Sequence, residues 1–435
     1  MLTSRIRSVG RFLTRGKLWG AIYTSLVSKV VTMVSSWIVL PLLAIHLGPE
    51  YYGIYVLYLS FLSVINLTDS GMGSAIVRYV ARQTPCESFT LVRILRECIR
   101  FYLPIAALLT LGVFGALCIL HRDTMFSQAG FYMLLALLIM CAQSMLSPVF
   151  RIYLGAGMLS TWNKYGILAN TAFLVLASSC LVVGREMGLN LLFLVHALTA
   201  LSIPIFAIQR LSRGAGHMRA SHSGVGTDFK AGLVREAKFQ IPILACGIVQ
   251  REVPKWGVVL SFDSASLGKL GLLLVALGGL GGVVGMFSMA IWPKIAGYIQ
   301  NGDGESARQG RTTLYFVYAG FVLVLILLVA FAYLLSSGGV FSIKTYVYSV
   351  SSLAAFAAFA ALVIWEHIHY CMLMATGALG VVARISIAQA LVALVLWAYL
   401  PEGDALLRYI YAQIIAYLLC SFIAFPIVLQ KKISK

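Results

Sequence analysis

The chain has 435 residues, of which 60% are apolar and only 11% are charged. An average soluble domain carries about a quarter charged residues, so this composition cannot cover a soluble surface of that size. It predicts a polytopic membrane protein. The stretches between apolar segments are short, which excludes a soluble catalytic domain, an attached ATPase and a large extracytoplasmic domain.

Twelve apolar segments are long enough to cross a bilayer, at about 20 residues per helical span. They lie at 18–46, 52–76, 101–120, 129–150, 163–183, 188–208, 238–262, 269–293, 313–336, 345–373, 380–399 and 405–429. The alternation with a period of two that a β-barrel requires is not seen in the sequence. We therefore expect an all-α polytopic fold.

The net charge of +18 comes from 33 Lys and Arg residues against 15 Asp and Glu residues. The basic residues fall mainly in alternate segments between the spans, which predicts that both termini are cytoplasmic. Topology and contact with anionic membrane lipids account for the charge, so we expect no nucleic-acid partner. The first apolar run reads as a retained span rather than a cleaved signal.

A basic stretch at 210–237 divides the spans six and six. We expect a six-helix bundle at 1–209, a cytoplasmic linker at 210–237 and a second six-helix bundle at 238–435. Gly53 lies over Gly268 at an offset of 215 residues, each within a short turn between two spans. This pattern predicts a parallel repeat, whose interface would lie near the middle of the membrane.

The eight cysteines are scattered and form no CxxC pair, so they predict neither a metal site nor a disulfide framework. No nucleophile constellation and no cofactor motif is evident. We therefore expect a protein that is not an enzyme and that needs no cofactor.

Polar residues inside spans are costly and by default mark a pathway or a binding cavity. In the first half, those that recur at helical spacing are Ser25, Lys29, Thr32 and Ser36; Asn66 with Asp69; and Gln143, Ser147 and Arg151. Three ordinary explanations stay open. Lys29 could reach the membrane edge, Asp69 could form a structural salt bridge, and Arg151 could be a simple cytoplasmic-side arginine.

The seventh span places Arg251 and Lys255 four residues apart, on one helix face. Like charges repel unless an anion lies between them, and Arg with Lys suits a phosphate-bearing ligand. Pro242 and Pro254 predict a bend in this helix. The alternative is an internal network that includes Glu252.

In the tenth span, Glu366 and His369 lie three residues apart on one side of the helix. A buried carboxylate beside an imidazole could exchange protons near neutral pH. The alternative is a hydrogen-bonded patch between helices.

The segment from Pro41 to Arg78 contains Leu47-Gly48-x-Glu50-x-Tyr52-Gly53-x-Tyr55, followed by Asp69-x-Gly71-x-Gly73 and Arg78. It resembles the opening of the O-antigen and polysaccharide-biosynthesis oligosaccharide flippases (Wzx type). These belong to the multidrug/oligosaccharidyl-lipid/polysaccharide (MOP) exporter superfamily.

The resemblance implies two six-helix bundles around a central cavity with alternating access. The implied cargo is an undecaprenyl-pyrophosphate-linked oligosaccharide, carried across a bacterial inner membrane, with a polysaccharide polymerase and a chain-length regulator as pathway partners. The cationic cavity would use Lys29, Arg251, Lys255 and Arg151, with polar lining from Ser25, Thr32, Ser36, Asn66, Gln143 and Ser147. Coupling to a proton or sodium gradient would use Asp69, Glu252, Glu366 and His369.

Three other functions stay open. A multidrug antiporter of the same fold would favour carboxylates over Lys and Arg in its cavity. A polytopic O-antigen polymerase or glycosyltransferase would need a sizeable extracytoplasmic loop, whereas the outward gaps are short. A scaffold without transport activity would not need buried cations.

Overall fold

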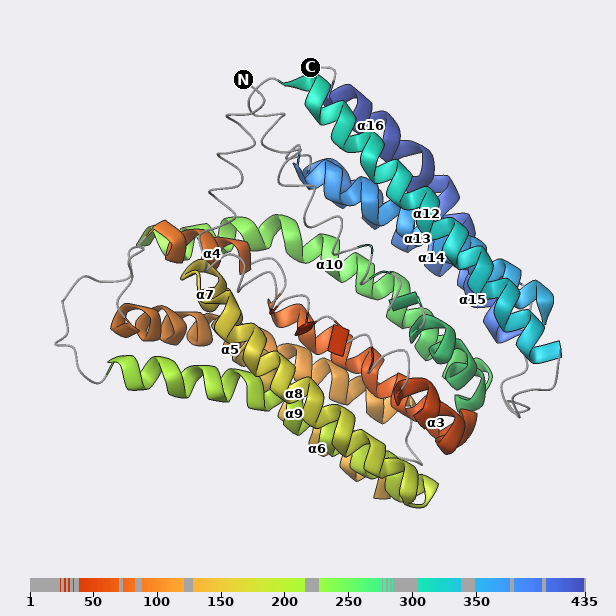
Figure 1. Ribbon diagram of the computed structural model, residues 1–435, viewed down its shortest axis with the longest axis horizontal. Helices are drawn as coiled ribbons and strands as arrows, with labels where there is room; N and C mark the ends of the chain where they lie inside the picture. Colours follow the sequence, from red (N-terminus) through yellow and green to blue (C-terminus); the bar gives the residue numbers. More distant parts are fainter. Residues whose placement is uncertain are drawn as a thin grey trace. The chain divides into compact units, whose positions relative to one another are not determined.

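The computed structural model describes most of the chain, and Figure 1 shows it as a set of long helices. The described residues are 39–69, 73–82, 88–120, 128–215, 227–275, 303–337, 349–375, 379–400 and 404–433, with single residues between 24 and 34 and between 277 and 284. All regular elements within these ranges are helical. The chain groups into two compact units, Met1–Leu43 with Val64–Ala237, and Ala44–Ser63 with Lys238–Lys435.

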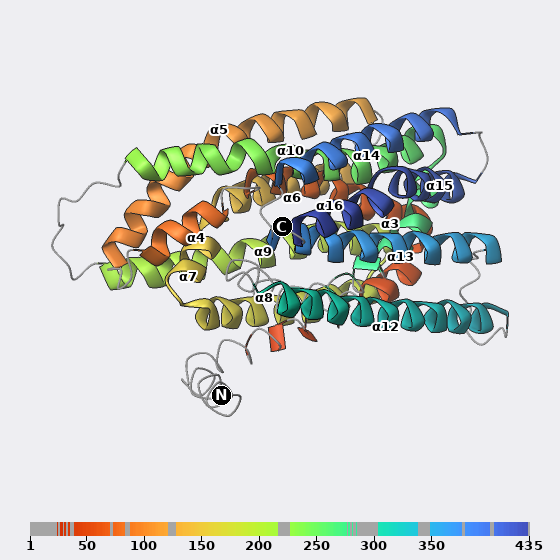
Figure 2. The same ribbon diagram turned by 90° about the horizontal axis from the view of Figure 1, so that it is seen from above.

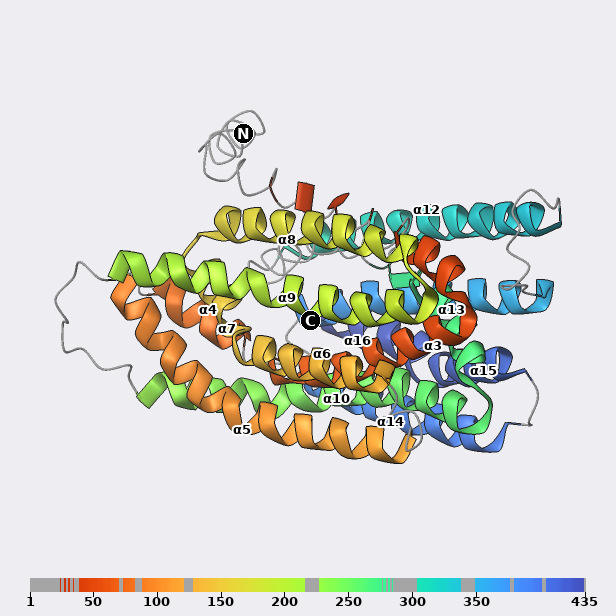
Figure 3. The ribbon, with the colours of Figure 1, turned by 90° about the horizontal axis from the view of Figure 1, so that it is seen from below.

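The first unit is a helical bundle organised around α9. Its elements are η2 (Asn66–Asp69), α4 (Gly73–Arg82), α5 (Ser88–Leu120), α6 (Gln128–Met145), α7 (Pro148–Gly155), α8 (Leu159–Ser179), η3 (Cys180–Val182) and α9 (Arg185–Ala215). Helix α9 packs against α5, α6 and α8, and α4 packs against α7 (Figure 3).

The second unit is organised around α13. Its elements are the later part of α10 (Thr227–Ser261), a helix at Ser264–Val275, α12 (Gly304–Ser337), α13 (Val350–Ala375), α14 (Leu379–Tyr399), α15 (Ala405–Tyr417), the π-helical segment η5 (Leu418–Phe422) and α16 (Ile423–Ile433). Helix α13 packs against α12, α15 and α16, and α14 packs against α15 (Figure 2).

Helix α3 (Leu40–Ile65) is two helices joined at Gly48, whose φ of 81° lies in the left-handed region that favours glycine. Pro49 follows, and proline fits the first position of a new helix because it has no N–H to leave unpaired. The expected turn between the first two spans therefore lies at Gly48.

Seven described helices are long and apolar enough to cross a membrane. They are Thr90–Gly115, Gly130–Gly155, Leu159–Val182, Arg185–Arg213, Val350–Leu373, Gly380–Tyr399 and Ala405–Lys431. Large apolar side chains such as Leu108 (71% exposed) and Leu111 (70% exposed) stand outward from them. Such side chains suit hydrocarbon rather than water, which agrees with the expected polytopic membrane protein. The expected spans 18–46 and 269–293 lie largely outside the described residues.

The division into units differs from the expected one at 44–63. These residues group with the second unit, although in sequence they lie between the two segments of the first unit. The start of the second half at Lys238 is the same in both. The expected linker, 210–237, is partly helical, because α9 runs to Ala215 and α10 begins at Thr227.

Candidate functional site

Each unit contains a cavity of its own, lined by both apolar and polar residues. The cavity of the first unit measures about 280 Å³ and is lined by Asn66, Gln143, Ser144, Leu146, Ser147, Phe150, Trp162 and Pro204. The cavity of the second unit measures about 330 Å³ and is lined by α10, α13, α15 and residues between Leu274 and Val284. We call them the first-unit cavity and the second-unit cavity.

The first-unit cavity lies where a membrane span is broken. The span Gly130–Gly155 consists of α6 and α7, separated by a turn at Leu146 and Ser147. Pro148, at the first turn of α7, favours a helix start there. Irregular backbone at membrane depth is tolerated where it lines a cavity, and broken helices are typical of transporter binding sites.

Three polar residues expected in the fourth and second spans meet at this cavity. Asn66 comes from η2, while Gln143 and Ser147 come from α6 and the turn that follows it. Within the described residues, Gln143 Oε1 and Ser147 Oγ are buried and have no hydrogen-bond partner. The cavity therefore holds polar atoms that are available to a ligand.

Arg151 is not among the residues that line either cavity. Its guanidinium lies over the ring of Phe150, at 5.1 Å from the ring centre, and its side chain packs against Gly73 of α4. A side chain at residue 73 would collide with that arginine, which explains the glycine there. The proposed role of Arg151 in cargo binding stays a prediction.

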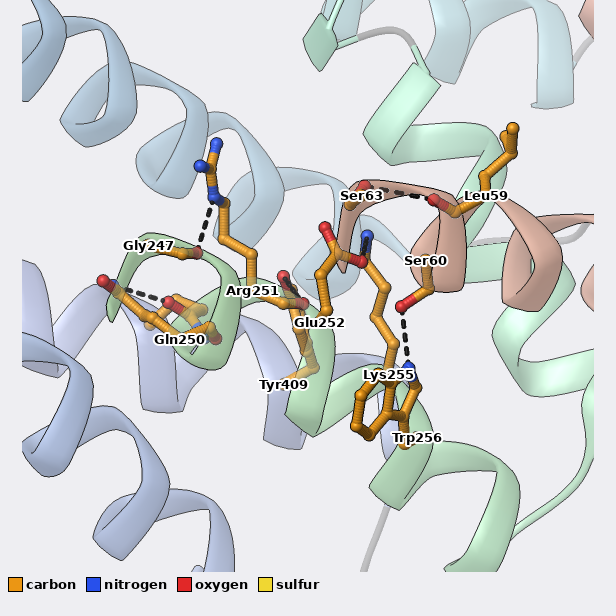
Figure 4. Close-up of polar contacts among 11 residues, drawn as sticks. Leu59, Ser60, Ser63, Gly247, Gln250, Arg251, Glu252, Lys255, Trp256 and Tyr409 are labelled. Atoms are coloured by element: carbon orange, nitrogen blue, oxygen red, sulfur yellow. Dashed lines mark hydrogen bonds and ion pairs between the residues drawn. The ribbon is translucent and has the colours of Figure 1, made fainter. Parts of the chain in front are cut away.

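The second-unit cavity receives Arg251, Glu252 and Lys255 from α10 (Figure 4). Arg251 is exposed, and its Nε donates to Gly247 O at 3.0 Å. If the expected seventh span crosses the membrane there, an exposed arginine is stable only next to water or a counter-ion. His367 and Tyr409 complete the polar lining.

Lys255 does not stand free beside Arg251. Its Nζ lies 2.7 Å from Glu252 Oε2, and the two side chains are 13% and 9% exposed. Residues three apart on a helix are close enough for a flexible lysine to reach its neighbour. Figure 4 shows Lys255 turned toward Glu252 while Arg251 runs back toward Gly247. For Glu252 and Lys255, this ion pair agrees with the internal network that the sequence analysis left open as the alternative to ligand binding.

Behind the cavity, three glutamines from three helices form a buried hydrogen-bond network. Gln250 Nε2 donates to Gln413 Oε1 at 3.0 Å, and Gln389 Nε2 donates to Gln250 Oε1 at 3.3 Å. Helix α10 stays helical across both Pro242 and Pro254. Because Pro254 has no N–H, it leaves the carbonyl of Gln250 without its helical partner, and Gln413 Nε2 donates to that oxygen at 2.9 Å.

Glu366 and His369 face different helices. Glu366 Oε1 accepts from Gln389 Nε2 at 3.3 Å and also hydrogen-bonds Tyr417. His369 is fully buried, with Nε2 3.1 Å from Tyr315 Oη and Nδ1 2.8 Å from Trp365 O. The two side chains therefore have different hydrogen-bond partners, and their role in proton exchange stays a prediction.

Several expected site residues lie outside the described part of the chain. These are Ser25, Lys29, Thr32 and Ser36, and only the backbone of Asp69 is described. Their roles stay predictions.

Sequence reasoning missed the aromatic and amide members of both sites. These are Ser144, Phe150 and Trp162 in the first unit, and Gln250, His367, Gln389, Tyr409, Gln413 and Tyr417 in the second. The available signal was the presence of glutamines inside apolar spans, since an amide in hydrocarbon needs a partner.

No family model and no curated protein sequence matches the chain. Solved structures do match. An inward-facing multidrug-resistance transporter of the MATE family, in the MOP superfamily, aligns with a TM-score of 0.65 at 12% identity, over 92% of this chain and 95% of that chain.

An outward-facing multidrug-resistance MATE transporter aligns with a TM-score of 0.53 at 12% identity, over 96% of both chains. A MOP-superfamily transporter from Pyrococcus furiosus Vc1 (DSM3638) aligns with a TM-score of 0.52 at 13% identity, over 96% of this chain and 94% of that chain. This chain has the fold of the MATE transporters. The expected fold is thereby confirmed, while the resemblance to the oligosaccharide flippases of the MOP superfamily stays a prediction.

Proposed function

We propose that the chain is a transporter, not an enzyme, that moves an undecaprenyl-pyrophosphate-linked oligosaccharide across a bacterial inner membrane. Arg251 carries the proposal. It lies in the expected seventh span, lines the second-unit cavity and has no carboxylate within ion-pair distance among the described residues. Its charge is therefore available to an anionic group of the cargo.

The cargo explains why such a charge would be kept at membrane depth. A pyrophosphate cannot cross about 30 Å of hydrocarbon without compensating charge. A guanidinium presents a planar fork of N–H donors that fits phosphate oxygens in pairs. Since Glu252 balances Lys255, Arg251 gives this cavity a net positive charge. The prenyl tail can stay in lipid throughout transport.

We propose that the energy comes from an ion gradient or from consumption of the cargo afterwards. Carboxylates at membrane depth are the candidates for binding a coupling ion. Glu366 is our candidate among those described, because it hydrogen-bonds Gln389 and Tyr417 and lies within electrostatic reach of Arg251, the cation that we assign to the cargo.

A second candidate is a multidrug exporter on the same fold. Glu252 lines the same cavity as Arg251, and a carboxylate favours a cationic drug. Two of the similar structures are described as multidrug-resistance transporters, and the Pyrococcus furiosus structure is described as having a binding pocket of reversed polarity. The fold thus accommodates pockets of either sign, and the cargo must be decided by experiment.

The experiment is to delete the gene in its native host and to locate the lipid-linked repeat unit. Accumulation in the cytoplasmic leaflet, relieved by the wild-type gene, supports the flippase. Repeat units that reach the outer leaflet but stay unpolymerised would instead identify a polymerase or ligase. Unchanged repeat units together with increased sensitivity to cationic drugs would identify a multidrug exporter.

A further inference from the structure

The first-unit cavity differs in chemistry from the second-unit cavity. None of the described residues that line it carries a charge, whereas the second-unit cavity contains Arg251, Glu252 and Lys255. Arg151 does not line this cavity, although its guanidinium lies over the ring of the lining residue Phe150, at 5.1 Å from the ring centre, and its side chain packs on Gly73. An anion would therefore find no opposite charge among these lining residues.

The backbone donors at the α6–α7 break are already used. The amides of Leu146, Ser147, Val149 and Phe150 all donate to carbonyls three residues earlier, at 3.0 to 3.2 Å. A phosphate or carboxylate, which needs donors, is therefore poorly matched to this break. The side-chain atoms without a partner among the described residues are Gln143 Oε1, which can only accept, and Ser147 Oγ, whose hydroxyl can both accept and donate.

Pro204 of α9 also lines the cavity. A proline inside a helix removes the N–H that would pair with the carbonyl four residues earlier, which here belongs to Ala200. Buried oxygens of this kind gain free energy when a ligand donates hydrogen bonds to them. The cavity thus fits a neutral ligand with several hydroxyl groups.

An aromatic wall stands beside these oxygens. The rings of Phe150 and Trp162 are 5.2 Å apart between centroids and tilted by 44°, and Tyr153 packs behind Trp162 at 6.0 Å. The face of an aromatic ring is electron-rich and attracts polarised hydrogens. A sugar ring offers C–H bonds on its face and hydroxyl groups at its edge, which is the combination that this cavity presents.

We propose that the first-unit cavity is a saccharide-binding subsite. A sugar ring packs on Trp162, next to the Phe150 ring that Arg151 covers, and its hydroxyl groups donate to Gln143 and Ser147. The volume of about 280 Å³ is near the lower end of the roughly 300–1,000 Å³ of small-molecule sites, which suits one or two sugar rings. The role in transport rests on the proposed function, whereas saccharide binding can be tested without it.

The test uses the purified full-length protein in lipid nanodiscs. Binding of free glucose, galactose, N-acetylglucosamine and rhamnose is measured by saturation-transfer NMR, with inorganic pyrophosphate as the anionic probe. We expect at least one sugar to bind, and we expect Gln143→Leu and Trp162→Leu each to weaken it about tenfold, the loss of one good contact. Trp162→Phe should keep most of the affinity.

The matched control is Asn190→Leu. Asn190 Oδ1 is also buried without a partner within the described residues, but Asn190 does not line this cavity. Gln143→Leu replaces an unpaired buried amide by an apolar group, so it should not lower the thermal stability. Absence of binding by every sugar, or equal loss in Asn190→Leu, overturns the proposal.

A second arm separates this inference from the proposed function. Transport into proteoliposomes is compared for undecaprenyl pyrophosphate with and without an attached sugar. We expect Gln143→Leu to slow only the sugar-bearing lipid, and Arg251→Ala to slow both. If the Gln143→Leu variant transports both lipids as fast as the wild-type protein does, the saccharide subsite alone is overturned. Sugar binding without transport of either lipid overturns the proposed function alone.

Discussion

Gly53 and Gly268 pack against each other, and each blocks the space for a side chain at the other. A Cβ at either glycine would lie 3.1 Å from the backbone nitrogen of the other, and closer still to a carbonyl oxygen. The oxygen that faces Gly53 belongs to Ser264, and the oxygen that faces Gly268 belongs to Pro49. Gly53 and Gly268 are 215 residues apart in sequence, and so are Pro49 and Ser264. The contact is therefore reciprocal, as a parallel repeat predicts at its axis.

We expect Gly53→Ala and Gly268→Ala each to destabilise the protein by at least the roughly 1–3 kcal/mol of an overpacked core. Because both methyl groups separate the same two helices, the double variant should cost less than the sum. Thermal unfolding in detergent measures this. Gly115→Ala is the control, because its new methyl group meets open space. Additive losses would show that the two glycines are independent.

Replacing Arg251 tests the charge of the second-unit cavity. Arg251→Ala should slow transport of a pyrophosphate-bearing lipid by about tenfold or more, and Arg251→Lys should retain part of the rate because only the charge remains. Arg384→Ala is the matched control. Arg384 Nε also donates to the carbonyl four residues earlier, at 3.3 Å, but Arg384 does not line the cavity. Equal effects of the two alanine variants would contradict the assignment.

The contribution of the Lys255–Glu252 ion pair to stability should depend on its burial. Glu252→Gln leaves the lysine charge without its partner, and removal of one partner of a buried pair costs up to about 3–5 kcal/mol. The double variant Glu252→Gln/Lys255→Met should recover much of this loss. The pair Arg100–Glu97 has the same spacing at 2.8 Å, but Arg100 is 68% exposed. Glu97→Gln should therefore change stability by less than about 1 kcal/mol, and a similar loss in both would sink the argument.

Gln413 should compensate for Pro254. Gln413→Leu leaves the freed carbonyl of Gln250 unpaired, at a cost of about 1–3 kcal/mol. In a Pro254→Ala background the helix can supply its own N–H, so the same substitution should cost less. A double-mutant cycle on thermal unfolding measures the difference. If Gln413→Leu costs the same in both backgrounds, the compensation does not exist.

Glu366 should be needed for ion coupling but not for folding. Glu366→Gln keeps an oxygen that can accept from Gln389 Nε2, so the fold should be retained. We expect transport in proteoliposomes to become independent of an imposed proton or sodium gradient. Glu305→Gln, an exposed acidic position at the start of α12, is the control. Gradient-dependent transport by Glu366→Gln would exclude this carboxylate as the coupling group.

The sequence by itself was enough to predict the all-helical membrane fold and the offset that relates Gly53 to Gly268. These properties follow from hydropathy, charge and spacing, which are local along the chain. It was also enough to predict that Arg251 would face a polar space, because a charged side chain in a span has few other stable positions.

Tertiary structure alone decided which groups meet. Helical spacing assigns a residue to a face, but it does not say which helix packs on that face. Glu366 and His369, three residues apart, therefore have different partners on different helices. Trp162 and Gln143 meet at one cavity for the same reason, since α8 is packed beside the broken span and brings its aromatic ring to the unpaired amide.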